Sequence, residues 1–217
     1  ALASIQDDDL RLKSGYRKVI QATTYIIFPV MVFLAVLARP IFIVFLEPRW
    51  LAGVPYLQLL CLAGLMYPLH VVNLNVLKVK GRSDLFLYLE IFKKILTLVM
   101  LFISVRYGIW GLLVGQVATS FLAYLPNCYF TARLISYPPS EQIKDVCPAL
   151  LSSASAGGVL LLINKIAIIK VSMLILVLQV FAGFVVYLLL SKILKVESQE
   201  MIWEICHASF CKKFCKN

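Results

Sequence analysis

Three of the polar side chains in a long apolar stretch of the first half of the chain share one helix face, where a lipid bilayer would make polar groups costly. The stretch runs from Leu51 to Leu77, and the side chains are Gln58, His70 and Asn73. At about 100° per residue on a helix, Asn73 lies about 60° and His70 about 120° from Gln58, so the three share one stripe. Amide and imidazole groups at membrane depth usually face a bundle interior or a cavity. The stripe is a candidate wall of a polar cavity, and His70 alone is either a packing histidine or a proton relay.

A second polar stripe occupies the first half of the next apolar stretch. Glu90, Lys93, Lys94 and Thr97 follow the spacing i, i+3, i+4 and i+7, which places them on one face of a helix. One interpretation is a helix start at the membrane surface, with Glu90 paired to Lys94. The other is a cationic cavity wall that attracts an anionic substrate, to which Arg82 in the preceding loop would add positive charge.

The residue sets that enzymes use for acid–base or phosphoryl chemistry are not visible. Of the eleven acidic residues, only Glu90 lies well inside an apolar stretch. The sequence shows no carboxylate pair, no Ser/His/Asp set and no glycine-rich phosphate loop. We therefore expect a protein that is not an enzyme and that carries no cofactor.

Two clusters contain residue types that bind metals. The first is a run of three aspartates, Asp7, Asp8 and Asp9. Mg²⁺ would need a second acidic cluster to complete its oxygen ligands, and none follows. The second comprises Cys206, His207, Cys211 and Cys215. Its spacing fits no strong zinc pattern, and reversible acylation is an alternative. We expect no metal, and we expect residues 198–217 to form an amphipathic helix on the membrane surface.

Composition places the chain in a membrane. Its 217 residues are 61% hydrophobic and only 15% charged, whereas soluble domains have about 25% charged residues. Six apolar stretches are long enough to cross a bilayer. Their bounds are Gln21–Ala38 (continued by Ile41–Leu46), Leu51–Leu77, Asp84–Val105, Gly111–Phe130, Cys147–Ile163 and Val171–Leu190. The sequence predicts an all-α, polytopic bundle of six transmembrane helices.

Several positions in these stretches predict how the helices pack. Pro29 removes one backbone hydrogen bond from the first stretch, and we expect a neighbouring helix to satisfy the freed carbonyl. Gly111 and Gly115 form a small-xxx-small pair that permits close helix contact. The Ser-, Ala- and Gly-rich stretch Cys147–Ile163 also predicts tight packing, whereas the aliphatic stretch Val171–Leu190 is expected to face lipid.

The basic residues predict an orientation. Six passes put both ends of the chain on one side, where 16 of the 21 Lys and Arg residues would lie, against 5 on the other. Such an excess marks the cytoplasmic side. The net charge of +10 is dispersed between the apolar stretches, so membrane lipid is the expected partner and nucleic acid is not.

Several short segments, taken in order, resemble one family. They are Ser4–Lys18 (SIQDDDLRLKSGYRK), Pro29, Leu37–Pro40, Lys80–Asp84 and Tyr107–Gly111. Over about residues 1–190 the chain is similar to bacterial polysaccharide and lipopolysaccharide flippases of the Wzx type, which belong to the multidrug/oligosaccharidyl-lipid/polysaccharide superfamily.

This resemblance implies a MATE-like fold of about twelve to fourteen spans, in two six-helix bundles around a central cavity. Because the chain opens with Ala1 in a charged segment, we expect it to be the C-terminal portion, with the N-terminal half of the same chain missing. Residues 1–134 would hold four spans of the second bundle, residues 135–195 two additional spans and residues 196–217 the cytoplasmic tail.

The resemblance also implies a function. Such flippases move undecaprenyl-diphosphate-linked oligosaccharide units across the bacterial cytoplasmic membrane for lipopolysaccharide, capsule or exopolysaccharide synthesis, and the coupling ion would be H⁺ or Na⁺. The residues suited to a cavity for this substrate are Lys93, Lys94, Arg82, Gln58, His70 and Asn73. One alternative is a cation-coupled multidrug antiporter, which would need buried carboxylates. Another is a membrane-embedded enzyme that acts on polyprenyl phosphates.

Overall fold

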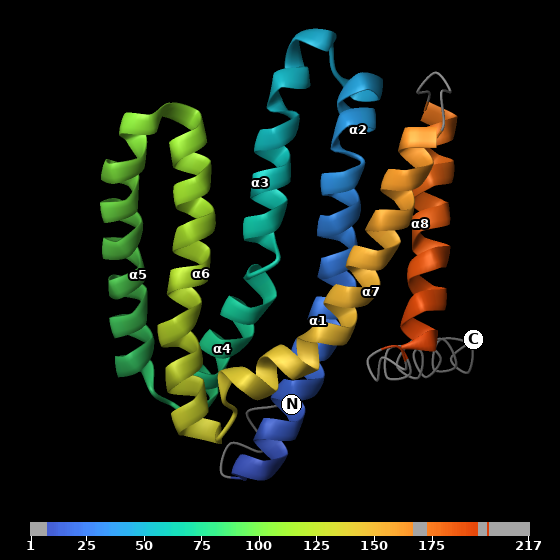
Figure 1. Ribbon diagram of the computed structural model, residues 1–217. Coiled ribbons are helices and arrows are strands. Elements are labelled where there is room, and N and C mark those ends of the chain that lie inside the picture. Colours follow the sequence, from blue (N-terminus) through green and yellow to red (C-terminus); the bar gives the residue numbers. More distant parts are fainter. Residues whose placement is uncertain (1–7, 167–172, 195–198, 200–217) are drawn as a thin grey trace, which may run out of the picture.

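The computed structural model describes residues 8–166, 173–194 and 199, and they form helices joined by short turns (Figure 1). The elements are α1 (Asp9–Val36), α2 (Ala38–Phe45), η2 (Pro48–Gly53), α3 (Val54–Gly64), α4 (Tyr67–Val79), α5 (Ser83–Ser104), η3 (Val105–Tyr107), α6 (Gly108–Ile135), α7 (Pro139–Ile166) and α8 (Met173–Ile193). No strand occurs in these residue ranges. The predicted all-α class is confirmed.

Successive helical passes run in opposite directions through the bundle (Figure 1). The α1–α2 pass is followed by the α3–α4 pass in the reverse direction, and α5, α6, α7 and α8 continue the alternation. The beginning of α1 and the end of α8 therefore lie toward the same end of the bundle, as the even number of apolar stretches predicts.

Four segments are long and apolar enough to cross a membrane by length and composition. They are Asp9–Val36, Pro48–Val79, Pro139–Asn164 and Met173–Ile193. Helices α5 and α6 have spanning lengths of 22 and 28 residues, but α5 carries Glu90, Lys93 and Lys94 near its middle. A multi-pass membrane bundle is confirmed, while crossings by α5 and α6 remain predictions.

Helix α1 runs without a break from the charged start of the chain into the first apolar stretch. Asp8 caps it by accepting a hydrogen bond of 3.1 Å from the Arg11 backbone N–H, as an acid at a helix start should. Pro29 lies inside α1 and cannot donate to the Tyr25 carbonyl one turn earlier. The Tyr187 hydroxyl of α8 donates to that carbonyl at 2.8 Å. The expectation that a neighbouring helix satisfies the freed carbonyl is confirmed.

The second apolar stretch is two helices rather than one. Helix α3 ends at Gly64 and α4 begins at Tyr67, with a turn at Leu65 and Met66 between them. Pro68 accounts for the break, because it lacks the N–H that would bond to Gly64 and its ring crowds the preceding turn. The helical-wheel relation expected across the whole stretch is therefore lost at this turn.

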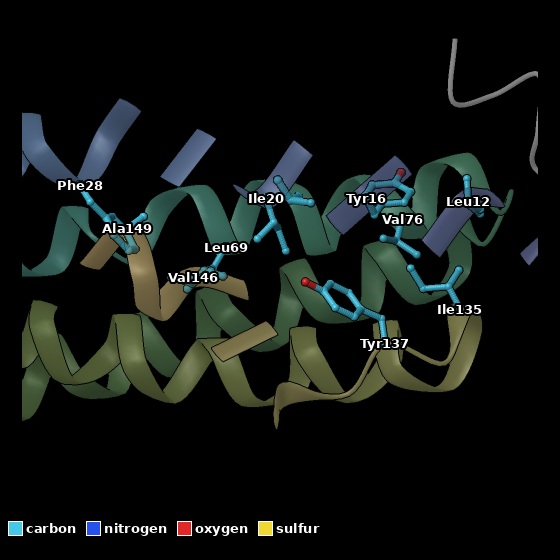
Figure 2. Packing of buried hydrophobic residues seen from close by; sticks show 11 residues of the cluster. Leu12, Tyr16, Ile20, Phe28, Leu69, Val76, Ile135, Tyr137, Val146 and Ala149 are labelled. Atoms are coloured by element: carbon cyan, nitrogen blue, oxygen red, sulfur yellow. The ribbon is translucent and has the colours of Figure 1, made fainter. Parts of the chain in front are cut away.

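The main apolar cluster joins helices from both ends of the chain (Figure 2). Leu12, Tyr16, Ile20 and Phe28 of α1 meet residues of α4, the end of α6 and α7 there. The other members of the cluster are Leu69, Val72, Val76, Ile135, Tyr137, Val146 and Ala149. Lipid is as apolar as these side chains, so close packing and hydrogen bonds rather than escape from water hold such helices together.

Small residues bring the helix pairs close. A Cβ atom on Gly115 of α6 would lie 2.2 Å from the Ser104 Oγ of α5, and one on Gly111 would lie 2.4 Å from the Ser104 carbonyl oxygen. Both approaches exclude a larger side chain without movement, so the predicted close contact at Gly111 and Gly115 is confirmed. Helix α7 approaches α1 in the same way, because a Cβ on Gly157 would lie 2.5 Å from Val32.

Some expectations concern residues outside the described ranges. They are Asp7 of the acidic run, the amphipathic tail 198–217 apart from Gln199, and the set Cys206, His207, Cys211 and Cys215. Among the residues that are described, no three His, Cys, Asp or Glu side chains come together as ligands for a metal ion.

Candidate functional site

The His70 side chain extends from α4 toward α6, and both of its ring nitrogens form hydrogen bonds. Its Nε2 is 3.0 Å from the Ser120 carbonyl oxygen, and its Nδ1 is 3.0 Å from the Asn127 amide nitrogen. Since a carbonyl only accepts and an amide NH₂ only donates, the ring is the neutral tautomer that carries its proton on Nε2. Asn127 is fully buried, and its Oδ1 has no hydrogen-bond partner in the part of the chain that the structure describes.

The cationic stripe on α5 faces this position in part. Lys93 forms an ion pair with Glu90 across one turn of α5 and interacts electrostatically with His70. The expected partner of Glu90 was Lys94, but the i, i+3 spacing prevails in the structure. Lys94 is exposed, and no ion pair of its ammonium occurs within the described part of the chain. Within the described residues, Lys94 is therefore an unpaired cation. The neighbouring Lys93, by contrast, has its charge offset by Glu90.

Asn73 forms a closed amide pair with α7. Its Nδ2 donates to Gln142 Oε1 at 3.0 Å, and Gln142 Nε2 donates to Asn73 Oδ1 at 3.1 Å. Both side chains are fully buried. Tyr124 of α6 also donates to Gln142 Oε1 at 3.2 Å. In this arrangement Asn73 is fully buried and links α4 to α7 and, through Gln142, to α6.

Gln58 and Arg82 lie away from this group. The Gln58 amide of α3 donates to the Ala35 carbonyl at 3.1 Å, which satisfies an acceptor in the last turn of α1. Arg82 follows Gly81, whose φ of 67° ends α4, and makes hydrogen bonds of 3.0 and 2.9 Å to the Asp84 carboxylate. The hydrogen bond to Asp84 raises the pKa of Arg82, so this exposed side chain stays charged.

The structure thus places His70 and Asn73 one turn apart on α4 in adjoining networks, with Lys93 within electrostatic range of His70. It does not bring Gln58 or Arg82 to them. The polar stripe that a single helix would have formed is divided, because α3 and α4 face different partners: Gln58 bonds to α1, His70 to α6 and Asn73 to α7.

A buried carboxylate that the sequence analysis did not single out lies at the start of α7. Asp145 accepts bonds of 2.7 and 2.6 Å from the Arg17 guanidinium of α1, and its side chain is only 6% exposed. Tyr137, in the turn before α7, donates to the same carboxylate at 2.7 Å. Burial, followed by this hydrogen bond, raises the pKa of Tyr137, so the phenol remains a neutral donor. The only sequence signal was the position of Asp145 two residues before an apolar stretch.

An apolar groove of about 980 Å³ separates α1 from α8. Pro29 and Phe33 line one wall, and Val180 and Phe184 line the other. Tyr25 and Tyr187 close one part of it, with ring centroids 5.1 Å apart. The groove has the chemistry of a hydrocarbon site and lies within two of the four segments able to span a membrane.

Comparisons with known proteins give three findings. A family model described as "Polysaccharide biosynthesis protein" matches residues 1–55. The chain is 31% identical over 207 residues to an "Uncharacterized membrane protein in cps region" of Klebsiella pneumoniae, covering 87% of this chain and 39% of that protein. It is 27% identical over 129 residues to the "Lipopolysaccharide biosynthesis protein WzxC" of Escherichia coli strain K12, covering 57% and 26% of the two chains. No solved structure matches significantly. The chain spans less than half the length of the curated relatives it matches.

Proposed function

Because this chain is related to the membrane proteins of polysaccharide biosynthesis, we propose that it is part of a flippase for undecaprenyl-diphosphate-linked oligosaccharide units. The flippase would move these units across the bacterial cytoplasmic membrane for lipopolysaccharide, capsule or exopolysaccharide synthesis. The observation that carries the proposal is the similarity over 87% of the chain to a membrane protein of a cps region.

Two features of the structure support a substrate with an anionic head and an apolar tail. Lys94 offers an unpaired ammonium on α5, and an ammonium on a flexible stem can follow a moving phosphate. The groove between α1 and α8 offers apolar walls of the kind that a polyprenyl chain would contact. Alternating access, in which helix bundles rock around a bound substrate, suits a protein of this class.

The carboxylates bear on the antiporter alternative. A cation-coupled multidrug antiporter would exchange ions at buried carboxylates, but Asp145 is held by Arg17 and Glu90 by Lys93. Neither carboxylate is available for exchange without first breaking an ion pair. This arrangement favours the flippase over that alternative.

The proposed function is tested by reversing the free charge. In the natural host, Lys94→Glu should reduce surface polysaccharide by about tenfold or more, with lipid-linked oligosaccharide accumulating in the inner leaflet. Lys94→Arg, which keeps the charge, should have a much smaller effect. Lys192→Glu, at the exposed end of α8, serves as the matched control. The double variant Lys93→Glu, Lys94→Glu should be as severe as Lys94→Glu.

Protein abundance in the membrane is measured for each variant, so that loss of folding is separated from loss of flipping. Normal surface polysaccharide from abundant Lys94→Glu protein would remove this cation from the substrate path. Normal polysaccharide after deletion of the whole gene, in a host with no second copy, would overturn the proposed function itself.

A further inference from the structure

The fully buried Asn127 side chain on α6 places its amide nitrogen against the His70 ring, and its oxygen has no partner among the described residues. We propose that His70 and Asn127 form a proton-binding site between α4 and α6. The ligand is a single proton taken from water, and the product is an imidazolium. This site is defined by protonation of the chain itself, and it does not depend on the proposed flippase function.

In the neutral state the site holds one hydrogen bond on each side of the ring. His70 Nε2–H donates to the Ser120 carbonyl at 3.0 Å, and Nδ1 accepts from the Asn127 NH₂ at 3.0 Å. This leaves the Asn127 oxygen without a donor, although the side chain has no exposure. A buried acceptor without a donor is unfavourable. The neutral state is therefore incompletely satisfied.

A proton on Nδ1 would give the Asn127 oxygen a charged donor after one rotation, and the amide NH₂ group would take the position that the oxygen leaves. The imidazolium donates from both nitrogens, so the bond to Ser120 persists unchanged. Turning the Asn127 amide by about 180° brings its oxygen to Nδ1 in the place of its NH₂. The two amide ends are similar in size, so the surrounding residues keep their positions. Hydrogen bonds to a charged donor are also stronger than those to a neutral one.

The charges around the site permit a proton to bind and also to leave. On α5, Lys93 lies within electrostatic range of His70 and is paired with Glu90. From α6 the titratable neighbours are Tyr124, which donates to Gln142, and Cys128, whose thiol points to Tyr124 at 3.5 Å.

Helix α1 packs against another side of α4 and presents Tyr16 there. Its cations Lys13 and Arg17 are paired with Glu141 and Asp145. Among the described residues no unpaired carboxylate therefore contacts the ring, so the proton is held by the hydrogen bonds alone.

The donor set selects a proton over an alkali cation. Na⁺ in transporters is held by several oxygen atoms, including backbone carbonyls. Here the Ser120 carbonyl already accepts from His70, and among the described residues the Asn127 side chain next to the ring offers a single oxygen without a partner. A single oxygen beside an imidazole nitrogen suits H⁺.

The test uses the full chain with ¹⁵N-labelled histidine in lipid nanodiscs. The chain has two histidines, so His207→Gln leaves His70 as the one reporter. The ¹⁵N spectrum is recorded between about pH 5 and pH 8. We expect two well-separated resonances at high pH, with the proton on Nε2, and two nearly equal resonances at low pH, as in an imidazolium.

Variants at Asn127 separate a proton site from simple packing. Asn127→Leu removes the acceptor and should lower the titration midpoint by about one pH unit. Asn127→Asp supplies a permanent acceptor and should raise the midpoint. Gln116→Leu, on the same helix but with an exposed side chain, should leave the midpoint unchanged.

A ring that stays neutral across the range in both the wild type and Asn127→Asp would overturn the proposal. A ring that titrates with the same midpoint in every Asn127 variant would also overturn it. If Asn127→Leu does not fold, the titration midpoint of Asn127→Asp is compared with that of Gln116→Leu, and a higher midpoint in Asn127→Asp supports the proton site. Because the readout is a protonation state, its failure leaves the flippase proposal untouched.

Discussion

At the scale of single residues, the buried hydroxyls of Tyr187 and Tyr16 differ in their hydrogen bonding. The Tyr187 hydroxyl donates to the Tyr25 carbonyl that Pro29 leaves free, whereas the Tyr16 hydroxyl has no partner within residues 8–166, 173–194 and 199. Both side chains are 1% exposed. A carbonyl inside the bilayer cannot form a hydrogen bond with water. The Tyr187 bond therefore replaces the backbone hydrogen bond that Pro29 removes.

We expect Tyr187→Phe to lower the free energy of unfolding by about 1–2 kcal/mol, because it leaves the Tyr25 carbonyl unsatisfied. Tyr16→Phe removes a hydroxyl that bonds to nothing, so it should be neutral within about 0.5 kcal/mol or slightly stabilising. Unfolding in mixed micelles with increasing denaturing detergent measures both. Equal losses from the two variants would show that ring packing rather than the hydrogen bond is responsible.

At the scale of elements, α7 is held to α1 along its length rather than appended to the bundle. Ion pairs from Lys13 to Glu141 at 2.7 Å and from Arg17 to Asp145 at 2.6 Å join the two helices near the start of α7. Further along, α7 presents the two adjacent glycines Gly157 and Gly158. A Cβ on Gly157 would lie 2.5 Å from Val32, whereas a Cβ on Gly158 would have nothing within 4 Å.

This pair gives an internally matched test of helix contact. Gly157→Ala should destabilise the protein by about 1–3 kcal/mol, because β-branched Val32 cannot easily turn away. Gly158→Ala should be neutral or stabilising by up to about 1 kcal/mol, since alanine favours the helix and meets no neighbour. Thermal unfolding in detergent micelles compares the two. If both variants are equally destabilised, α7 does not approach α1 as described.

At the scale of the whole molecule, the alternation of the passes and the distribution of charge agree. The turns after α4 and α6 lie toward the same end of the bundle as the start of α1 (Figure 1). That end carries most of the Lys and Arg residues, and positive charge collects on the cytoplasmic side. We therefore predict that both ends of the chain are cytoplasmic.

Reporter fusions test this orientation. Alkaline phosphatase, which is active outside the cytoplasm, should be active when fused after Glu47 or after Lys165. A fusion after Ser83, in the turn between α4 and α5, should be inactive, and a fluorescent protein at that position should be bright. The opposite pattern at all three positions would invert the orientation.

The sequence by itself determined the class of the protein and most of its helices. Apolar stretches of spanning length can only be helical in lipid, because each backbone group must bond within its own segment. This reason needs no knowledge of the neighbours, so most of the described residues in all six stretches are helical. The same local reasoning predicted the roles of Pro29 and of the Gly111–Gly115 pair. Those roles depend on the missing backbone N–H of proline and on the missing side chain of glycine.

Tertiary structure alone decided which polar side chains meet. Asp145 and Arg17 are 128 residues apart, and Asn73 and Gln142 are 69 residues apart. A helical wheel describes one helix only, so it grouped Gln58, His70 and Asn73 and could not supply Asn127 or Gln142 as partners. The break before Pro68 then divided the stripe among three different neighbours. The stability of a polar group inside a membrane depends on the side chain facing it, and that side chain is chosen by packing rather than by local sequence.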